Sequence, residues 1–321
     1  MDTAAKFGQL ALGLGAFAVV VAAILLVAGR LDGPRGDRRV AWLFLAPAVV
    51  GLAVAVVYPA VRTIIASFSD AHGERFIGLA NYATVFGSPD QLLVLRNTAV
   101  WVLLSPVAAT AVGLVYAVLV DRSRFEAAAK ALIFLPMAIS FVGASIIWKF
   151  VYEYRPDLPG VDQIGLLNRL LVAAGGSPRQ WLITPPLNTL LLVVVMIWIQ
   201  AGFAMTVLSA AIKEIPAEIV ESAQLDGVSG FGMFRRITLP SIRPALVVVL
   251  TTIAIWTLKV FDIVRTMTGG QFDSSVVANE FYTQSFRSDN QGLGSTLAVL
   301  LFVLVLPVIW YNIRQLRRWE A

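Results

Sequence analysis

Seven apolar stretches, each long enough to cross a lipid bilayer, constrain the fold of this chain more than any other feature. A membrane-spanning helix needs about 20 apolar residues, whereas a spanning barrel strand is much shorter. With 58% hydrophobic and 14% charged residues, the composition also lies outside the range of soluble globular proteins. The sequence therefore predicts an all-α integral membrane protein. The stretches lie near residues 7–29, 42–67, 97–120, 131–151, 188–211, 244–264 and 293–313.

The distribution of basic residues predicts how the chain is oriented. Arginine and lysine gather in alternate loops, which marks those loops as cytoplasmic, with the N-terminus outside and the C-terminus inside. Because the topology accounts for the net charge of +5, we expect no nucleic-acid partner. The basic residues of these loops are Arg30, Arg35, Arg38, Arg39, Arg122, Arg124, Lys130, Lys213, Arg235, Arg236, Arg243, Arg314, Arg317 and Arg318.

The first apolar stretch is predicted to be an anchoring helix rather than a cleaved signal peptide. It is longer than an ordinary signal core, and a basic cluster follows it. Residues 30–41 are rich in charge and in helix-breaking residues, which is typical of a linker. We therefore expect two parts: residues 1–41, an extra transmembrane helix with a basic linker, and residues 42–321, a core of six transmembrane helices.

Residues for catalysis and metal binding are scarce. The chain has no cysteine and a single histidine, His72, in a predicted external loop. It contains no Gly-x-x-x-x-Gly-Lys phosphate loop, since none of its lysines follows a glycine. We predict no catalytic residue, no metal site and no bound cofactor. If ATP drives this protein, a separate subunit binds it.

A polar segment, residues 221–240, interrupts the apolar pattern between two spans. Pro216 suits the first turn of a helix, and Gly227 suits a left-handed stop. Ser229 is placed to cap a second helix, which is expected to end before Pro240. This predicts a short helix-turn-helix that docks on a soluble partner.

The segment resembles the EAA loop of ABC importer permeases, in which Glu-Ala-Ala is followed by Asp-Gly-Ala and Ile-x-Leu-Pro. Ser222 and Val228 replace the usual alanines. The resemblance implies that residues 213–243, called the coupling loop below, contact an ATPase, with apolar contacts from Phe231 and Phe234. The stripe formed by Glu214, Glu218 and Glu221 is expected to face a basic cleft on it. The matching residues are Glu221, Ala223, Asp226, Gly227, Ile237, Leu239 and Pro240.

Other segments resemble the maltose-type carbohydrate permeases. These include Tyr58-Pro59, Phe134-Leu-Pro136 and residues 261–271, the last being similar to α-glucoside importer permeases. The resemblance implies a type I ABC importer permease in the bacterial inner membrane that takes up an oligosaccharide or α-glucoside. It also implies three partners: a second homologous permease, a homodimeric ATPase holding ATP and Mg, and an extracytoplasmic solute-binding protein.

Two alternatives stay open: an ABC permease for a non-sugar solute, and an ion-coupled carrier. Few ionisable residues fall within the spans, which argues against a highly charged solute and against a proton relay. A sugar needs hydrogen-bonding side chains and aromatic surfaces. The candidates are Asn188, Trp198 and Gln200 on the fifth span, with Lys259 and Asp262, which are spaced to pair with each other or to shape an external opening.

Two shorter segments also carry helix signals. Ser123 and Glu126 have the spacing of a capping box, and Glu126 and Lys130 can pair at i,i+4, so a helix is expected to begin there. The long external segment between the fourth and fifth spans, rich in proline and glycine, is expected to hold a helix near residues 164–173.

Overall fold

The computed structural model describes residues 3–28, 34–121 and 123–319. The chain separates into two compact units, residues 1–63 and 64–321. In the first unit α1 (Thr3–Ala28) is followed by α2 (Pro34–Leu52), the π-helix η1 (Ala53–Val57) and the start of α3 (Tyr58–Ala66). Since α2 begins at Pro34, the second half of the predicted linker is helical, as a proline in the first turn allows. The predicted cytoplasmic Arg30 and Arg122 lie outside the described residues, as do the side chains of Arg35, Arg38, Arg39, Arg317 and Arg318.

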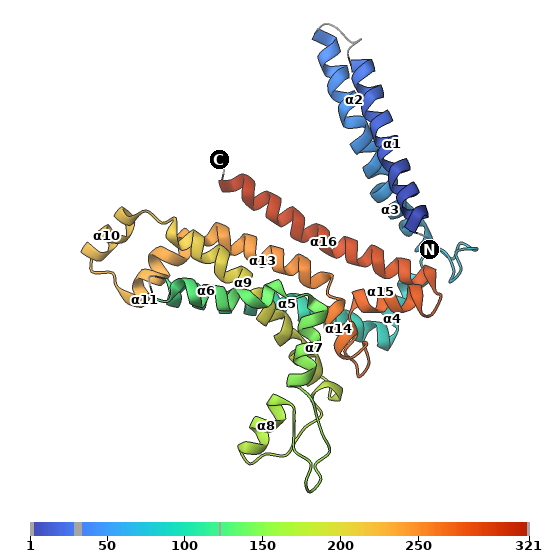
Figure 1. The fold of residues 1–321 in the computed structure, drawn as a ribbon. Coiled ribbons are helices and arrows are strands. Elements are labelled where there is room, and N and C mark those ends of the chain that lie inside the picture. The colour runs from blue at the N-terminus through green and yellow to red at the C-terminus, as the bar shows by residue number, and fades with distance from the viewer. Residues whose placement is uncertain (1–2, 29–33, 122, 320–321) are drawn as a thin grey trace. The chain divides into compact units, whose positions relative to one another are not determined.

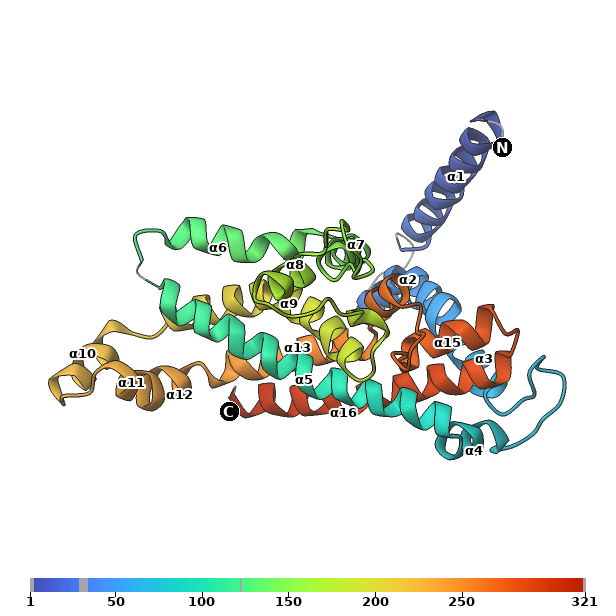
Figure 2. The same cartoon turned by 90° about the horizontal axis from the view of Figure 1, so that it is seen from below.

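The second unit is a bundle of long helices that run side by side, with shorter helices at both ends (Figures 1 and 2). Its elements are α4 (Ala80–Gly87), α5 (Pro89–Val120), α6 (Glu126–Phe134), the 3-10 helix η2 (Leu135–Ala138), α7 (Phe141–Val151), α8 (Leu166–Ala173), the 3-10 helix η3 (Trp181–Ile183), α9 (Leu187–Lys213), α10 (Ala217–Leu225), α11 (Gly230–Met233), the π-helix η4 (Phe234–Thr238), α12 (Leu239–Ser241), α13 (Arg243–Leu258), α14 (Asp262–Met267), α15 (Val277–Phe286) and α16 (Gln291–Trp319).

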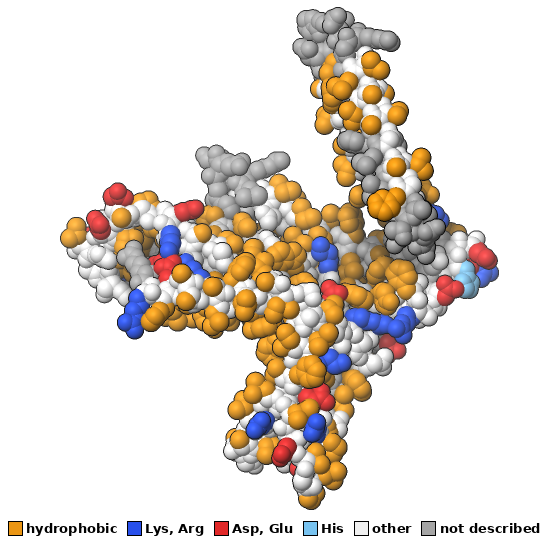
Figure 3. All heavy atoms as spheres, viewed as in Figure 1, with side chains coloured by type: hydrophobic (Ala, Val, Ile, Leu, Met, Phe, Trp, Pro, Cys, Tyr) orange, Lys and Arg blue, Asp and Glu red, His pale blue; other side chains and the backbone are white. Residues whose placement is uncertain are grey.

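Helices α5 and α9 form the centre of this bundle, and α13 packs on both. Gly113 of α5 permits their close approach, because a Cβ atom there would lie 2.5 Å from the Cβ of Ala204. Ala109, Ala117 and Leu208 are buried in the same cluster. Small residues are expected at such contacts, because helices in a bilayer associate by close packing rather than by excluding water. Hydrophobic side chains are spread over the whole visible surface of this unit, as expected for a bundle that faces lipid (Figure 3).

The described part of the chain contains five helices long and apolar enough to cross a membrane, or seven candidate spans if each of two bent helix pairs is one span. The predicted span over 131–151 is sharply bent, because α6 and η2 meet α7 at 102°. Pro136 lacks a backbone donor, and the Oγ of Ser140 accepts a hydrogen bond from the Gly143 amide at 3.1 Å, so that a new helix begins.

The predicted span over 244–264 also differs, because α13 ends at Leu258. The amides of Lys259 and Val260 donate three residues back, to Trp256 and Thr257, which tightens the last turn. Phe261, with φ −130° and ψ −54°, then leaves helical geometry. The expected i,i+3 neighbours Lys259 and Asp262 therefore lie on either side of a helix end, and no ion pair joins these two described residues.

Buried amide side chains hold the loops at the end of the bundle that carries α4 and α15 (Figures 1 and 2). Asn81 donates to the carbonyls of Ser67 and Ser69 at 3.0 and 2.8 Å. Asn97 donates to the carbonyls of Asp273 and Ser275 at 2.6 and 3.0 Å. These bonds satisfy backbone groups that lie outside helices.

A separate loop between α7 and α9 extends away from the bundle and contains α8, where a helix was predicted (Figure 1). Asn168 of α8 is fully buried and donates to the carbonyls of Glu153 and Arg179 at 2.9 and 3.0 Å. Its Oδ1 accepts from the indole of Trp181 at 2.9 Å. This one amide thus connects three separate parts of the loop between α7 and α9.

Candidate functional site

The coupling loop forms the predicted helix-turn-helix at the opposite end of the bundle from α4 and α15 (Figures 1 and 2). At the end of α10, Gly227 has a φ of 78°, which confirms the expected left-handed stop. The Val228 amide donates to the Ala223 carbonyl at 2.9 Å and the Gly227 amide to the Gln224 carbonyl at 3.0 Å. This pair of bonds defines a Schellman motif, and it ends α10 sharply.

Three local expectations for the coupling loop are wrong. Ser229 precedes α11 with an extended backbone, but its side chain makes no capping bond. The second helix does not end before Pro240, because the π-helix η4 runs directly into α12, where Pro240 lies in the first turn and needs no donor. Glu214 belongs to the end of α9, so only Glu218 and Glu221 lie on α10.

A capping box at the start of α6 is also absent. Glu126 is the first helical residue rather than the third, and the Ser123 hydroxyl accepts from the Phe125 amide instead, at 3.3 Å. The pair between Glu126 and Lys130 is confirmed, at 2.6 Å.

The predicted coupling residues divide into an outward set and an inward set. Glu221, Asp226, Gly227, Phe231 and Pro240 are exposed, whereas Ala223 is buried and Phe234, Ile237 and Leu239 are partly buried. Acidic side chains gather on the visible surface at the end of the bundle that carries α10 (Figure 3).

One exposed residue of the coupling loop was missed by the sequence analysis. Leu225 is 90% exposed and Phe231 is 75% exposed. Exposed apolar side chains beside acidic ones are typical of a protein contact surface. A leucine directly before Asp226-Gly227, at the tip of a polar loop, was a signal that could have found Leu225.

A cavity of about 460 Å³ lies where α6 and α7 are broken apart. Gln200 is 1% exposed, and within the described part of the chain its Oε1 has no hydrogen-bond partner. Lys259 reaches the same cavity. An irregular backbone at membrane depth is tolerated where it lines a cavity, which fits the break at residues 139–140. The lining residues are Met137, Ile139, Ser140, Phe141, Ile199, Gln200, Trp256 and Lys259.

The structure brings together only part of the predicted pathway set. Asn188 donates to the Phe272 carbonyl at 2.6 Å and accepts from the Thr189 amide at 2.7 Å, so both ends of its amide are used within the fold. Trp198 packs edge-on against Trp148, with ring centroids 5.7 Å apart. Asp262 begins α14 and is not among the residues that line the cavity.

Two aromatic residues line the cavity, Phe141 and Trp256, and the sequence had not pointed to Trp256. Its position three residues before Lys259 on the same apolar stretch was a signal that could have found it. Among the residues that the structure describes, no group of His, Asp or Glu side chains has the arrangement of a metal site.

The bundle of helices long and apolar enough to span a membrane is typical of a multi-pass membrane protein. Residues 109–318 match the family described as binding-protein-dependent transport system inner membrane component. The chain is 45% identical over 278 residues to the osmoprotective compounds uptake permease protein GgtC of Synechocystis sp., covering 87% of this chain and 99% of the relative. It is also 45% identical over 278 residues to the alpha-glucoside transport system permease protein AglF of Rhizobium meliloti, covering 86% of this chain and 82% of the relative.

A solved bacterial alginate ABC transporter, in complex with an alginate pentasaccharide-bound periplasmic protein, contains a chain of the same fold. It matches with a TM-score of 0.75 at 22% identity, over 88% of this chain and 95% of that chain. The chain therefore belongs to the family of binding-protein-dependent transport system inner membrane components. It is a multi-pass inner-membrane permease subunit of an ABC transporter and not an enzyme, since ATP hydrolysis in this family belongs to a separate subunit.

Proposed function

We propose that this permease subunit imports a neutral oligosaccharide or α-glucoside. The observation that carries the proposal is the cavity at the break between α6 and α7, which combines the buried, unpaired amide oxygen of Gln200 with the indole of Trp256. A sugar offers hydroxyl groups to the amide and an apolar ring face to the indole. The 45% identity to AglF, which is named an alpha-glucoside permease, supports the same class of solute.

The proposed solute pathway includes the cavity residues Gln200 and Lys259, but not the other three residues that the sequence suggested for it. Gln200 would bind a hydroxyl group of the solute, and Lys259 would donate to another oxygen at the edge of the cavity. Asn188 and Trp198 would act through the packing of the surrounding elements, because their contacts lie within the fold, and Asp262 would lie outside the pathway, because it does not line the cavity.

The coupling loop would contact the ATPase and transmit the conformational change driven by ATP hydrolysis to the permease. Its exposed apolar residues, Leu225 and Phe231, would contact an apolar surface of the ATPase, and Glu221 would pair with a basic side chain there. Gly227 would keep the turn tight, and Ile237, Leu239 and Pro240 would shape η4 and α12 beneath it. ATP and Mg would be bound by this partner.

The complete importer would contain a second homologous permease, a homodimeric ATPase and an extracytoplasmic solute-binding protein. The alginate transporter, which has the same fold, was solved together with a periplasmic protein, and this supports the last of these partners. The coupling loop would face the cytoplasm, with the N-terminus outside and the C-terminus inside. Residues 1–41 would be an extra anchor on a six-helix core.

The test uses the purified chain reconstituted with these partners. Uptake of an α-glucoside should require ATP, should stimulate hydrolysis and should not change when a proton gradient is collapsed. Gly227→Val strains a left-handed turn and Glu221→Ala removes a charge, so each should reduce ATPase recovery or coupled uptake. Gln200→Ala should reduce uptake while leaving ATPase recovery unchanged.

A control with Glu74→Ala, which alters an exposed residue distant in sequence from both sites, should behave as the unaltered protein. Stimulation by charged solutes alone would refute the sugar assignment. Uptake that follows the proton gradient without ATP would refute the importer mechanism.

A further inference from the structure

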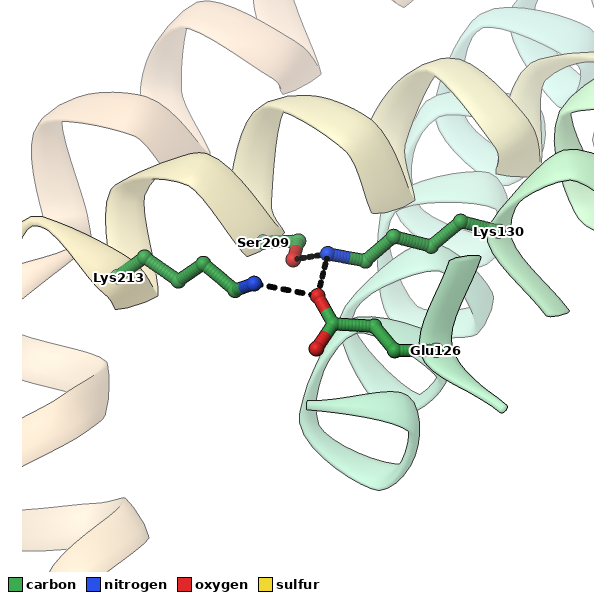
Figure 4. Close-up of polar contacts among 4 residues, drawn as sticks. All are labelled: Glu126, Lys130, Ser209 and Lys213. Carbon is green, nitrogen blue, oxygen red and sulfur yellow. Dashed lines mark hydrogen bonds and ion pairs between the residues drawn. The ribbon is translucent and has the colours of Figure 1, made fainter. Parts of the chain in front are cut away.

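Four polar side chains join α6 to the end of α9 that leads into the coupling loop (Figure 4). Glu126, the first residue of α6, accepts a hydrogen bond from Lys130 at 2.6 Å and another from Lys213, the last residue of α9. Lys130 also donates to the hydroxyl of Ser209 at 2.5 Å. We call these residues the α6–α9 cluster. It crosses between the helices twice, once from Glu126 to Lys213 and once from Lys130 to Ser209.

A second contact holds the other end of α6 against the same face of α9. A Cβ atom at Gly202 would lie 2.6 Å from the carbonyl oxygen of Ile133 and 3.0 Å from the Cα of Phe134. Gly202 precedes Ser209 by seven residues, and Ser209 precedes Lys213 by four, so all three lie on one face of α9. Helix α6 is therefore fixed to α9 at both of its ends.

Beyond its first residue, Lys213, the coupling loop lacks polar attachments of this kind. In the part of the chain that the structure describes, no hydrogen bond or ion pair joins residues 217–241 to another element of the bundle. The connecting segment Glu214–Pro216 borders two cavities, of about 700 and about 330 Å³. Lys213, the last residue of α9, is thus the point at which the ion pair with Glu126 is attached to the start of the coupling loop.

The other end of α6 leads into the wall of the transport cavity. Helix α6 continues into η2, and Met137, Ile139 and Ser140 line that cavity opposite Gln200 and Lys259. One short element therefore has the base of the coupling loop at one end and the cavity wall at the other.

We propose that Glu126 and Lys213 are positioning residues for transport. Their ion pair makes α6 follow the base of the coupling loop, so that displacement of the loop moves η2 and changes the cavity. This inference rests on the proposed function, because it takes the coupling loop as the contact to the ATPase.

The experiment compares Glu126→Gln and Lys213→Gln in the reconstituted importer, with solute transported per ATP hydrolysed as the readout. Each variant should recover the ATPase normally and hydrolyse ATP, while the ratio falls about fivefold, a usual size for coupling between sites. The double variant should lose no more than Glu126→Gln alone, because that substitution already removes the ion pair with Lys213 along with the one with Lys130. Lys213→Arg should keep the ratio, and so should Arg314→Gln, a control that removes a basic residue on α16, outside the cluster.

Because the chain has no cysteine, a second measurement separates positioning from folding. Glu126→Cys combined with Lys213→Cys should show the low ratio, and a short bismaleimide linking the two cysteines should restore it without restoring charge. An unchanged ratio in both glutamine variants, additive losses in the double variant, or no recovery after cross-linking would overturn the proposal. A wild-type complex without ATP-dependent uptake would instead refute the proposed function, and this inference with it.

Discussion

The two ends of the bundle hold their loops in opposite ways. At the end that carries α4 and α15, buried amides such as Asn97 and Asn188 donate to backbone carbonyls far away in the sequence. At the other end, residues 217–241 of the coupling loop show no polar bond to another element among the described residues, and the loop exposes Leu225 and Phe231. The difference indicates that the first set of loops is complete within this chain, whereas the second leaves contacts for another protein.

The largest effect should follow from removing an amide at the α15 end. Asn97→Ala would remove the donor to the half-buried carbonyl of Asp273 and to the buried carbonyl of Ser275, next to a backbone with φ of 56° at Phe272 and 58° at Asp273. We expect a loss of about 3 kcal/mol in the free energy of unfolding. For Asn188→Ala, which frees one carbonyl, we expect about 2 kcal/mol. Thermal unfolding in detergent measures both.

The control for these variants is Glu218→Ala on α10, which alters an exposed side chain and should leave the unfolding midpoint unchanged. The Asn188→Ala variant distinguishes a structural role of this amide from a role in the solute pathway. If Asn188→Ala lowered transport while thermal stability stayed the same, the amide would belong to the pathway, as the sequence predicted, and the contrast between the two ends would fail.

At the coupling loop we expect substitutions to leave stability unchanged and to weaken binding of the ATPase. Leu225→Ala and Phe231→Ala should leave the unfolding midpoint unchanged, because both side chains are exposed in the isolated subunit. Each should weaken binding of the ATPase by about tenfold, or about 1.4 kcal/mol, because apolar area is no longer buried in the complex. Equilibrium binding to the purified ATPase gives the measurement. Phe86→Ala, an exposed aromatic residue on α4, is the matched control and should bind normally. A loss of stability in either variant would show that the loop is held by its own chain.

What the sequence predicted correctly depends on local structure. The spans follow from the length of the apolar stretches, and the stop at Gly227 follows from the need for a left-handed residue. The roles of the amides depend on which carbonyl lies opposite, and this is decided by tertiary packing: Asn188 meets the Phe272 carbonyl across a long stretch of chain. For the same reason the sequence favoured Trp198 as the aromatic surface, whereas the packing of α13 directs Trp256 to the cavity.

The break between α6 and α7 falls between these two cases. Pro136, Ser140 and Gly143 carried a local signal for a new helix start, but the apolar run of 131–151 favoured one continuous span. A cap can interrupt such a run where the freed backbone lines a cavity, and the presence of a cavity is not visible in the sequence.

The smallest effect sharpens the comparison between the coupling loop and the rest of the bundle, because it uses the same residue type at the same position of a helix. Ser140 and Ser229 both precede a helix with extended backbones, at ψ 150° and 165°. Only Ser140 caps its helix through the side chain, at 3.1 Å from the Gly143 amide. Ser140→Ala should cost about 1 kcal/mol of unfolding free energy, whereas Ser229→Ala should cost less than about 0.5 kcal/mol.

Ser140→Thr keeps the hydroxyl and is the control, with little expected change. Thermal unfolding in detergent measures all three variants side by side. Equal losses at Ser140 and Ser229 would mean that the hydroxyl of Ser229 caps α11 in solution, and that the coupling loop satisfies its own helix ends as fully as the rest of the bundle does. An unequal result in the expected direction would leave the first amides of α11 available to a partner, because a helix start without a side-chain cap keeps unsatisfied donors.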